Sequence, residues 1–343
     1  MNIAQRNFFR LLRVGIFGEE EQVEPMSAWK WQQLLKWARQ QQLVPLVYDG
    51  LCRCRHQFFL QLPQQQFDTW KEQTEGHEAK QGKAEGEVAE LLLTLGQLQL
   101  RPILLDPWPA ISLYDKPSHH GPATVNIFFP FATQGNKADE WARANGNHVD
   151  TPRKQLMRYE WKGLSVEHRH QMLHLNNKFN NSTLQAIVDQ EWLEGGTAHT
   201  VIGGQRIETV GPTLYFLATL LSIVRTTLAQ GLPLCQLADL GMLLRKQGHL
   251  VDFVKLQEWI DRLHFTRMAQ LAGTVLIRLL GFTADEVPFM LEPSADNDAD
   301  SLADNLLATG SRGSTAKYLR YCPGESLSSV VASITHSLGN IEE

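Results

Sequence analysis

The segment 123–129, which reads ATVNIFF, carries the first residues whose types and spacing suggest chemistry. Its apolar side chains predict a buried strand. Because side chains alternate along a strand, Thr124 and Asn126 point to the same face, while Val125 and Ile127 point to the other. Two small polar side chains side by side on a buried strand indicate either ordinary hydrogen bonding or the remains of a site.

A second group of candidates is the run HRHQMLH, with His168, His170 and His174. His168 and His170 share a face if this segment is a strand, and imidazole is a good zinc ligand. The segment 52–56, CRCRH, is a weaker metal candidate, because residues two apart on a helix do not share a face. No second Cys/His pair has matching spacing. We therefore expect hydrogen-bonded or solvated histidines and no bound metal.

Two further segments match known ligand-binding patterns only in part. The segment 310–317, GSRGSTAK, is basic and rich in glycine but fails the spacing of a phosphate-binding P-loop, so we expect a flexible tail there. The acidic segment 296–307 has the spacing of an EF-hand, but Ser301 replaces the required glycine and Leu307 the final glutamate. We expect no calcium site. The sequence contains no nucleophile elbow, dinucleotide fingerprint or HExxH motif.

The composition is that of a globular protein of 343 residues, with a formal net charge of -5 and 43% hydrophobic residues. The mild acidity argues against general nucleic-acid binding and against a membrane surface as partner. No apolar run approaches the roughly 20 residues of a membrane-spanning helix. The N-terminus lacks a signal-peptide pattern, and four cysteines are too few for a disulfide scaffold. The default expectation is a cytoplasmic protein.

The elements that would position these residues follow from hydrophobic periodicity. Helical stripes fill residues 5–60, a long polar helix runs from about 64 to 100, and the helical period returns from 212 to 291. Between them the sequence predicts two strands, at 102–105 and 124–131, and a short helix at 137–145. It also predicts two hairpins, one formed by 155–161 with 164–170 and one at 201–207.

This order of segments predicts an α+β fold with a small mixed sheet between an N-terminal helical region and a C-terminal helical bundle. We divide the chain into an N-terminal helical region (1–84), an α/β core (85–210), a helical bundle (211–291) and an acidic linker with a tail (292–343). The segment 292–304 contains turn-forming residues and acidic residues, which is typical of a linker or an exposed loop.

The segments resemble, in order and spacing, a bacterial family of nucleotidyltransferases within the polymerase-β-like superfamily, most of which are uncharacterised. The resemblance covers about residues 5–290. The matching positions are the opening FFRLLR (8–13), the Trp-rich helix leading to Leu43-Val44-Pro45-Leu46, Tyr114, Pro117, the hairpin strand Ser165-Val166-Glu167, and Leu237-Ala238-Asp239-Leu240. His148 falls where the family often has a histidine before this hairpin.

At the positions that carry the family's chemistry, this sequence departs from the pattern. The family's Lys-Gly pair falls on Asp106-Pro107, its arginine on His120, and its Gly-Asp-x-Asp motif on residues 123–126. Glu167 keeps the glutamate of the hairpin strand, and Arg169 stands where the family has a histidine. If Glu167 keeps the family's orientation, the neighbouring histidines face away from this site.

The resemblance implies that Thr124 and Asn126 occupy the places of two metal-binding aspartates. In such enzymes, paired carboxylates hold Mg²⁺ ions that neutralise the triphosphate and activate the attacking hydroxyl. Thr and Asn cannot supply those two negative charges, and their loss should cost several kcal/mol of transition-state stabilisation, the order expected of a metal ion. Asp106 would repel phosphate, and Pro107 removes a backbone donor.

We therefore predict a degenerate nucleotidyltransferase-like protein, a pseudoenzyme that binds or regulates rather than transfers. The candidate site comprises Glu167 as the surviving acidic residue, the degenerate positions Thr124 and Asn126, and the substrate-binding positions His120, Asp106, Tyr114 and Asp239. We expect no cofactor, and a nucleotide or other small anion or a protein as partner.

An active transferase is the alternative. It would move a nucleoside monophosphate from an NTP, with Mg²⁺, to a hydroxyl of a small molecule or a protein. Its remodelled site would draw charge from Glu167, Asp106 or Asp115.

Overall fold

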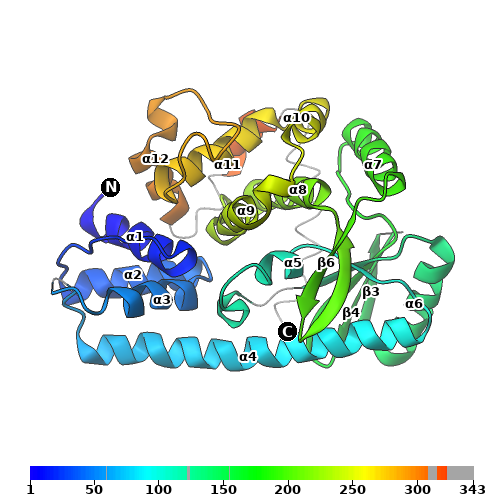
Figure 1. Cartoon of the computed structure of the whole chain (residues 1–343), viewed down its shortest axis with the longest axis horizontal. Helices are drawn as coiled ribbons and strands as arrows, with labels where there is room; N and C mark the ends of the chain where they lie inside the picture. Colours follow the sequence, from blue (N-terminus) through cyan, green and yellow to red (C-terminus); the bar gives the residue numbers. More distant parts are fainter. Residues whose placement is uncertain (59, 122–123, 154, 308–314, 323–343) are drawn as a thin grey trace.

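The computed structural model describes residues 1–58, 60–121, 124–153, 155–307 and 315–322. These residues form an α+β fold in which helices flank a mixed sheet of seven strands (Figure 1). The predicted fold class is therefore confirmed. Residues 308–314 and 323–343, both part of the predicted linker and tail, lie outside the described residues.

The N-terminal region consists of α1 (Ile3–Phe17), α2 (Ala28–Gln40) and α3 (Val44–Cys54). Helices α1 and α3 touch through their backbones, because both contribute a glycine at the contact. A Cβ atom on Gly15 would lie 1.9 Å from the Leu46 carbonyl oxygen, and one on Gly50 would lie 2.0 Å from that of Leu11. Any larger residue at either position would force the helices apart.

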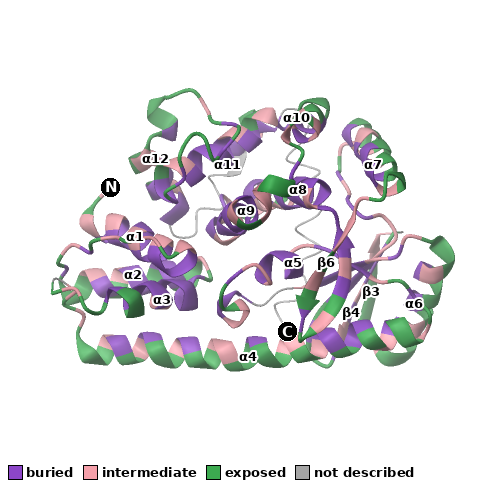
Figure 2. Ribbon diagram, viewed as in Figure 1, coloured by how far each residue is buried: buried purple, intermediate pink, exposed green. Residues whose placement is uncertain are grey.

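Helix α4 (Gln64–Gln97) joins two separate hydrophobic cores and runs beneath both parts of the molecule (Figure 1). Near its start, Trp70 is buried in the core of the helical regions. Near its end, Val88, Leu91 and Leu95 belong to the core that also contains the buried sheet residues. The rest of the helix is mostly exposed (Figure 2). A long helix with apolar residues at both ends thus fixes the sheet relative to the helices.

The sheet has the strand order β3-β4-β5-β2-β1-β7-β6. Its strands are β1 (Ile103–Leu104), β2 (Val125–Phe128), β3 (Asn147–Arg153), β4 (Leu156–Trp161), β5 (Leu164–Arg169), β6 (Thr197–Ile202) and β7 (Gln205–Val210). Strand β2 pairs with β5 in parallel and with β1 antiparallel. The pairs β4–β5 and β6–β7 are the two predicted hairpins. Strand β3 was not predicted, because its residues are mostly exposed and carry no apolar alternation.

Three helices connect strands of the sheet. They are α5 (Trp108–Ile111) between β1 and β2, α6 (Ala132–Asn145) between β2 and β3, and α7 (Lys178–Leu193) between β5 and β6. The C-terminal bundle consists of α8 (Pro212–Gln230), α9 (Leu234–Gln247), α10 (Phe253–Arg262), α11 (Thr266–Leu279) and α12 (Ala299–Leu307). Short 3-10 helices are η1 (Pro117–His119), η2 (Gly248–Leu250), η3 (Ala295–Asn297) and η4 (Thr315–Tyr321). Figure 2 shows α8 and α9 largely buried at the centre of the molecule.

Two expectations from the sequence are wrong here. The segment 292–304, predicted as a linker, contributes η3 and most of α12, because Leu302, Leu306 and Leu307 form an apolar helix face that is buried in the main core. Helix α8 does have the length and hydropathy of a membrane span, contrary to our expectation. However, 72% of that apolar window is buried inside the protein, which is typical of the core helix of a soluble protein.

Candidate functional site

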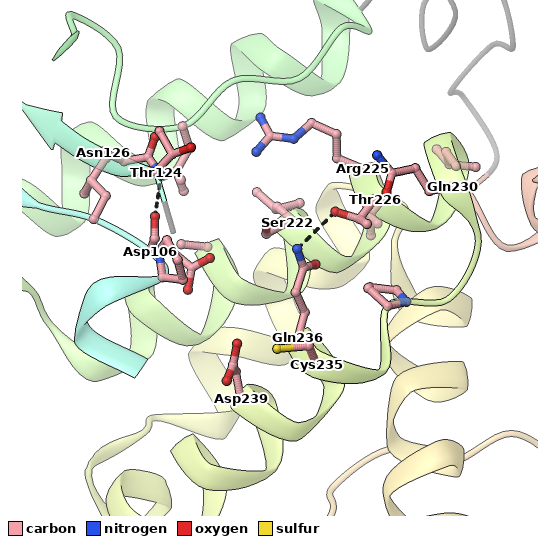
Figure 3. A pocket seen from close by; sticks show the side chains of 18 of the residues that line it. Asp106, Thr124, Asn126, Ser222, Arg225, Thr226, Gln230, Cys235, Gln236 and Asp239 are labelled. Carbon is pink, nitrogen blue, oxygen red and sulfur yellow. Dashed lines mark hydrogen bonds between the residues drawn. The ribbon is translucent and has the colours of Figure 1, made fainter. Parts of the chain in front are cut away.

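A cavity of about 530 Å³ lies where the sheet meets helices α8 and α9 (Figure 3). Of the residues predicted for the site, Thr124, Asn126, Asp106, His120 and Asp239 line this cavity. Residues from distant parts of the sequence therefore meet here. The cavity therefore brings five of the residues predicted for the site into one place.

At the sheet side of the cavity, the pairing of β2 with β5 brings the surviving glutamate next to the degenerate positions. Asn126 and Glu167 are direct neighbours in the parallel register. Arg169, the last residue of β5, donates from Nη2 to Asn126 Oδ1 and to Glu167 Oε2, both at 2.8 Å. The guanidinium of Arg169 thus lies between the degenerate position Asn126 and the surviving glutamate.

The carboxylate of Glu167 is fully engaged by arginine side chains. Its Oε1 accepts a hydrogen bond of 2.7 Å from Arg158, and its Oε2 is the acceptor for Arg169. Burial by itself raises the pKa of Glu167, but the positive charges of Arg169 and Arg158 outweigh it and lower the pKa to about 2. Glu167 is therefore ionised and neutralised by the protein itself, which leaves little negative charge to attract Mg²⁺.

Arg153 and Arg225 add positive charge to the same cavity. Neither side chain makes a hydrogen bond or an ion pair with any residue that the structure describes. Arg225 extends from α8 toward Thr124 and Asn126 (Figure 3). Its side chain is accessible to solvent, yet desolvation by the surrounding protein and then the charge of Arg169 lower its pKa to about 10.

The pKa of His174 is affected by the same excess of positive charge. Burial, followed by the charges of Arg153, Arg225 and Arg169, lowers its pKa to about 4. His174 is thus neutral near pH 7. The Nε atom of Arg169 is also buried without a hydrogen-bond partner among the described residues. The sheet side of the cavity therefore combines excess positive charge with unused hydrogen-bond donors, which is the chemistry that binds anions.

Asp106 lies beside this region and is held by hydrogen bonds from the neighbouring helix and strand. Its Oδ1 accepts hydrogen bonds from the hydroxyls of Tyr215, at 2.9 Å, and Thr219, at 3.4 Å, while its backbone carbonyl accepts one from Asn126 Nδ2 at 2.6 Å. Burial and then the charge of Asp239 raise the pKa of Asp106 to about 6. Asp106 is therefore still mostly ionised near pH 7, and its repulsion of phosphate would weaken only as the pH falls toward 6.

The helical wall of the cavity carries a different cluster, composed of His120, Asp239, Tyr114 and Cys235. His120 Nε2 lies 2.8 Å from Asp239 Oδ1 and 3.6 Å from Cys235 Sγ, and the Tyr114 hydroxyl donates to Asp239 Oδ1 at 2.7 Å. Burial lowers the pKa of His120, but the Asp239 and Cys235 charges outweigh it and raise that pKa well above its ordinary value. The predicted substrate-binding residues His120, Tyr114 and Asp239 thus form one hydrogen-bonded network.

Several candidates lie outside the cavity. Asp115 is exposed at the surface, pairs with Lys246 at 3.5 Å and is not among the residues that line the cavity. His168 and His170 lie on the other face of the sheet and both contact Asp139. The segment 52–56 contributes to no metal-binding group among the described residues. Ala123, the first position of the degenerate motif, lies outside the described residues.

Sequence reasoning missed Arg153, Arg225 and Cys235 as cavity residues. Arg225 did carry a signal, because it is a lone charge in the apolar helix sequence 212–230. Cys235 and Asp239 lie four residues apart, which places them on one face of a helix. Arg153 carried no signal, because its place depends on strand β3, which has no periodic pattern. All three positions depend on tertiary packing that periodicity does not specify.

Comparison with known proteins gives one match. A family model described as an uncharacterised nucleotidyltransferase matches residues 27–281. No curated protein and no solved structure matches the chain. The matched range contains the whole sheet, helices α8 and α9 and every residue of the cavity named above.

Proposed function

The chain belongs to this uncharacterised nucleotidyltransferase family, and from that premise we propose that it is a degenerate member that binds a phosphorylated anion without a metal ion and does not transfer a nucleotidyl group. One observation carries the proposal. The guanidinium of Arg169 bridges Asn126 and Glu167, so a fixed cation of the protein stands where the family chemistry would need Mg²⁺. We further propose a cytoplasmic location, in which nucleotides are abundant ligands.

The chemistry of the cavity supports this reading. Catalysis with two metal ions needs carboxylates that are free to coordinate, whereas Glu167 is already paired with Arg158 and Arg169. A phosphate group instead needs hydrogen-bond donors with positive charge, and Arg guanidinium groups bind its oxygens with two parallel hydrogen bonds. Arg225 and Arg153 are available for that purpose. The protein thus replaces the metal ions with arginines that can hold an anion but cannot activate a hydroxyl nucleophile.

The test is calorimetric titration of the full chain with ATP and with pyrophosphate, once with Mg²⁺ and once with EDTA. We expect comparable affinity under both conditions and no release of pyrophosphate from ATP. Bound ligand should also raise the free energy of unfolding by about 2.7 kcal/mol at a hundred times its dissociation constant. Binding that requires Mg²⁺, turnover of any NTP, or no binding of either phosphate compound would each overturn the proposal.

A set of variants tests the role of Arg169 separately. We expect Thr124→Asp with Asn126→Asp to gain no Mg²⁺-dependent nucleotide binding, because the Arg169 guanidinium would pair with the new carboxylates. The triple variant that adds Arg169→His, the residue type that the resemblance places there, should gain it. If the double variant already binds Mg²⁺ with nucleotide as well as the triple variant does, Arg169 is not the substitute for the metal.

A further inference from the structure

Three potential metal ligands of different chemistry converge on the helical wall of the cavity. The imidazole of His120, the thiol of Cys235 and the carboxylate of Asp239 each offer one ligand atom, and these atoms lie within 4.8 Å of one another. Among the described residues, this is the one group of three or more His, Cys, Asp or Glu side chains that could hold a metal ion. Cys235 and Asp239 lie one turn apart on α9, and His120 reaches them from the loop after η1. Figure 3 shows Cys235 and Asp239 on the same side of the pocket.

We propose that His120, Cys235 and Asp239 bind a zinc ion whose fourth coordination position opens into the cavity. Thiolate sulfur, imidazole nitrogen and carboxylate oxygen are the ligand atoms that zinc prefers, and three protein ligands with an open position are typical of reactive rather than structural zinc sites. All three residues line the cavity, so a water molecule or a bound anion can reach the fourth position.

The distances suit a tetrahedral site with little rearrangement. Zinc ligands at about 2.0–2.3 Å from the metal lie roughly 3.3–3.6 Å from one another in a tetrahedron. The separation of His120 Nε2 from Cys235 Sγ is 3.6 Å. The separation of His120 Nε2 from Asp239 Oδ1 is 2.8 Å, a hydrogen bond that zinc would replace by taking the place of the shared proton. Opening that pair by about half an ångström brings it to the tetrahedral separation, and the Cys235 and Asp239 ligand atoms already lie within 4.8 Å of each other.

Groups around the three ligands hold two of them in the required orientation. Metal-bound histidines usually donate their second ring N–H to a carbonyl oxygen or a carboxylate, and metal-bound carboxylates accept further hydrogen bonds. His120 Nδ1 lies 3.3 Å from the Gly121 carbonyl oxygen, which directs Nε2 toward the site. The Tyr114 hydroxyl donates to Asp239 at 2.7 Å. The backbone of His120 is itself fixed, because its carbonyl oxygen lies 2.5 Å from His77 Nε2 of helix α4.

The inference is independent of anion binding by the arginines, because it uses different residues and a different wall of the cavity. It also differs from the Mg²⁺ chemistry of the resemblance, which would involve the sheet residues Asn126 and Glu167. The cluster nevertheless faces the same cavity, so a zinc ion here would add a positive charge opposite Arg153 and Arg225.

The test is titration of the metal-free full chain with Co²⁺, which reports tetrahedral geometry in its visible bands and a thiolate ligand in its near-ultraviolet charge-transfer band. We expect both signals, their displacement by one equivalent of Zn²⁺, and a rise in melting temperature with Zn²⁺. Cys235→Ser should abolish the charge-transfer band and weaken Zn²⁺ binding at least tenfold. Cys52→Ser is the matched control, because Cys52 is an exposed thiol that does not line the cavity, and should leave all signals unchanged.

The proposal is wrong if the wild-type protein gives no tetrahedral spectrum with Co²⁺, or if Cys235→Ser keeps the charge-transfer band. The serine substitution is close in shape and Cys235 is only partly buried, so a folded variant is expected. Should that variant unfold, protection of Cys235 from alkylation by Zn²⁺ in the wild-type protein decides the same question. Zinc must slow the reaction at Cys235 and leave the rate at Cys52 unchanged.

Discussion

Strand β5 and the residue after it carry two polar clusters, one on each face of the sheet, and their hydrogen bonding differs. On the covered face, Asp139 of α6 contacts His168 Nδ1 at 3.3 Å and His170 Nε2 at 2.8 Å, and His168 Nε2 lies 2.8 Å from the Tyr159 hydroxyl. Both oxygens of Asp139 and both ring nitrogens of His168 are therefore used. On the cavity face, Glu167 and Arg169 are paired as well, but the arginines beyond them are not.

The difference shows how a structural cluster can be told from a binding site. The Asp139 cluster is complete without a ligand, because each charge already has a partner of opposite sign or a hydrogen bond. The cavity holds Arg153 and Arg225 without partners among the described residues. Burial, and then the charges of these two arginines and of Arg169, lower the pKa of His174 to about 4. These two guanidinium groups therefore keep hydrogen-bond donors and positive charge that an anion in the cavity could use.

The largest effect on stability is expected on the covered face. Asp139→Ala removes two hydrogen bonds from a buried carboxylate and should lower the free energy of unfolding by about 3 kcal/mol. Phosphate binding should not change. Glu140→Ala, the exposed neighbour on α6, is the control and should stay within about 0.5 kcal/mol of the wild type in chemical denaturation. A loss of phosphate affinity in Asp139→Ala, with its fold intact, would contradict the separation of the two faces.

A substitution on the cavity face should instead lower ligand affinity without lowering stability. Arg225→Leu removes an unpaired cation, so the free energy of unfolding should be unchanged or higher. Its affinity for pyrophosphate should fall about tenfold to a hundredfold, because a hydrogen bond to a charged group contributes about 1.5–3 kcal/mol. Calorimetry and denaturation of the same preparation measure both quantities. Arg143→Leu, at an exposed position of α6, should leave the affinity as it is, and equal losses in the two variants would point to net charge rather than a site.

The sequence predicted much of this architecture, because most elements have strong periodicity. The hairpin β4–β5 was predicted from alternation and from the turn at Gly163, whose φ of 87° suits glycine. The register of β2 with β5 sets Asn126 beside Glu167. The same reasoning could not predict that Arg153 and Arg225 lack partners, because pairing of a charged side chain depends on residues that tertiary packing brings near it. The local sequence around Arg225 does not indicate whether a carboxylate lies across the cavity from it.

The smallest expected effect concerns pH and the side chain of His174. In the empty protein its pKa is lowered from the usual 6.5 to about 4 by burial and by Arg153, Arg225 and Arg169. Between these values the unfolded chain binds more protons than the folded one, so the contribution of His174 to stability falls as the pH decreases from about 6.5 to 4. A bound anion would offset the three arginine charges and raise the pKa of His174, which couples binding to proton uptake.

It follows that pyrophosphate affinity should rise about threefold to tenfold from pH 7.5 to pH 5.5. Protonation of pyrophosphate itself also depends on pH, and the variant His174→Gln separates the two effects. The ratio of wild-type to variant affinity cancels the contribution of the ligand and should rise as the pH falls. A ratio that stays constant over this range would mean that the anion does not offset the charges around His174, and would place it at a different part of the cavity from Arg153 and Arg225.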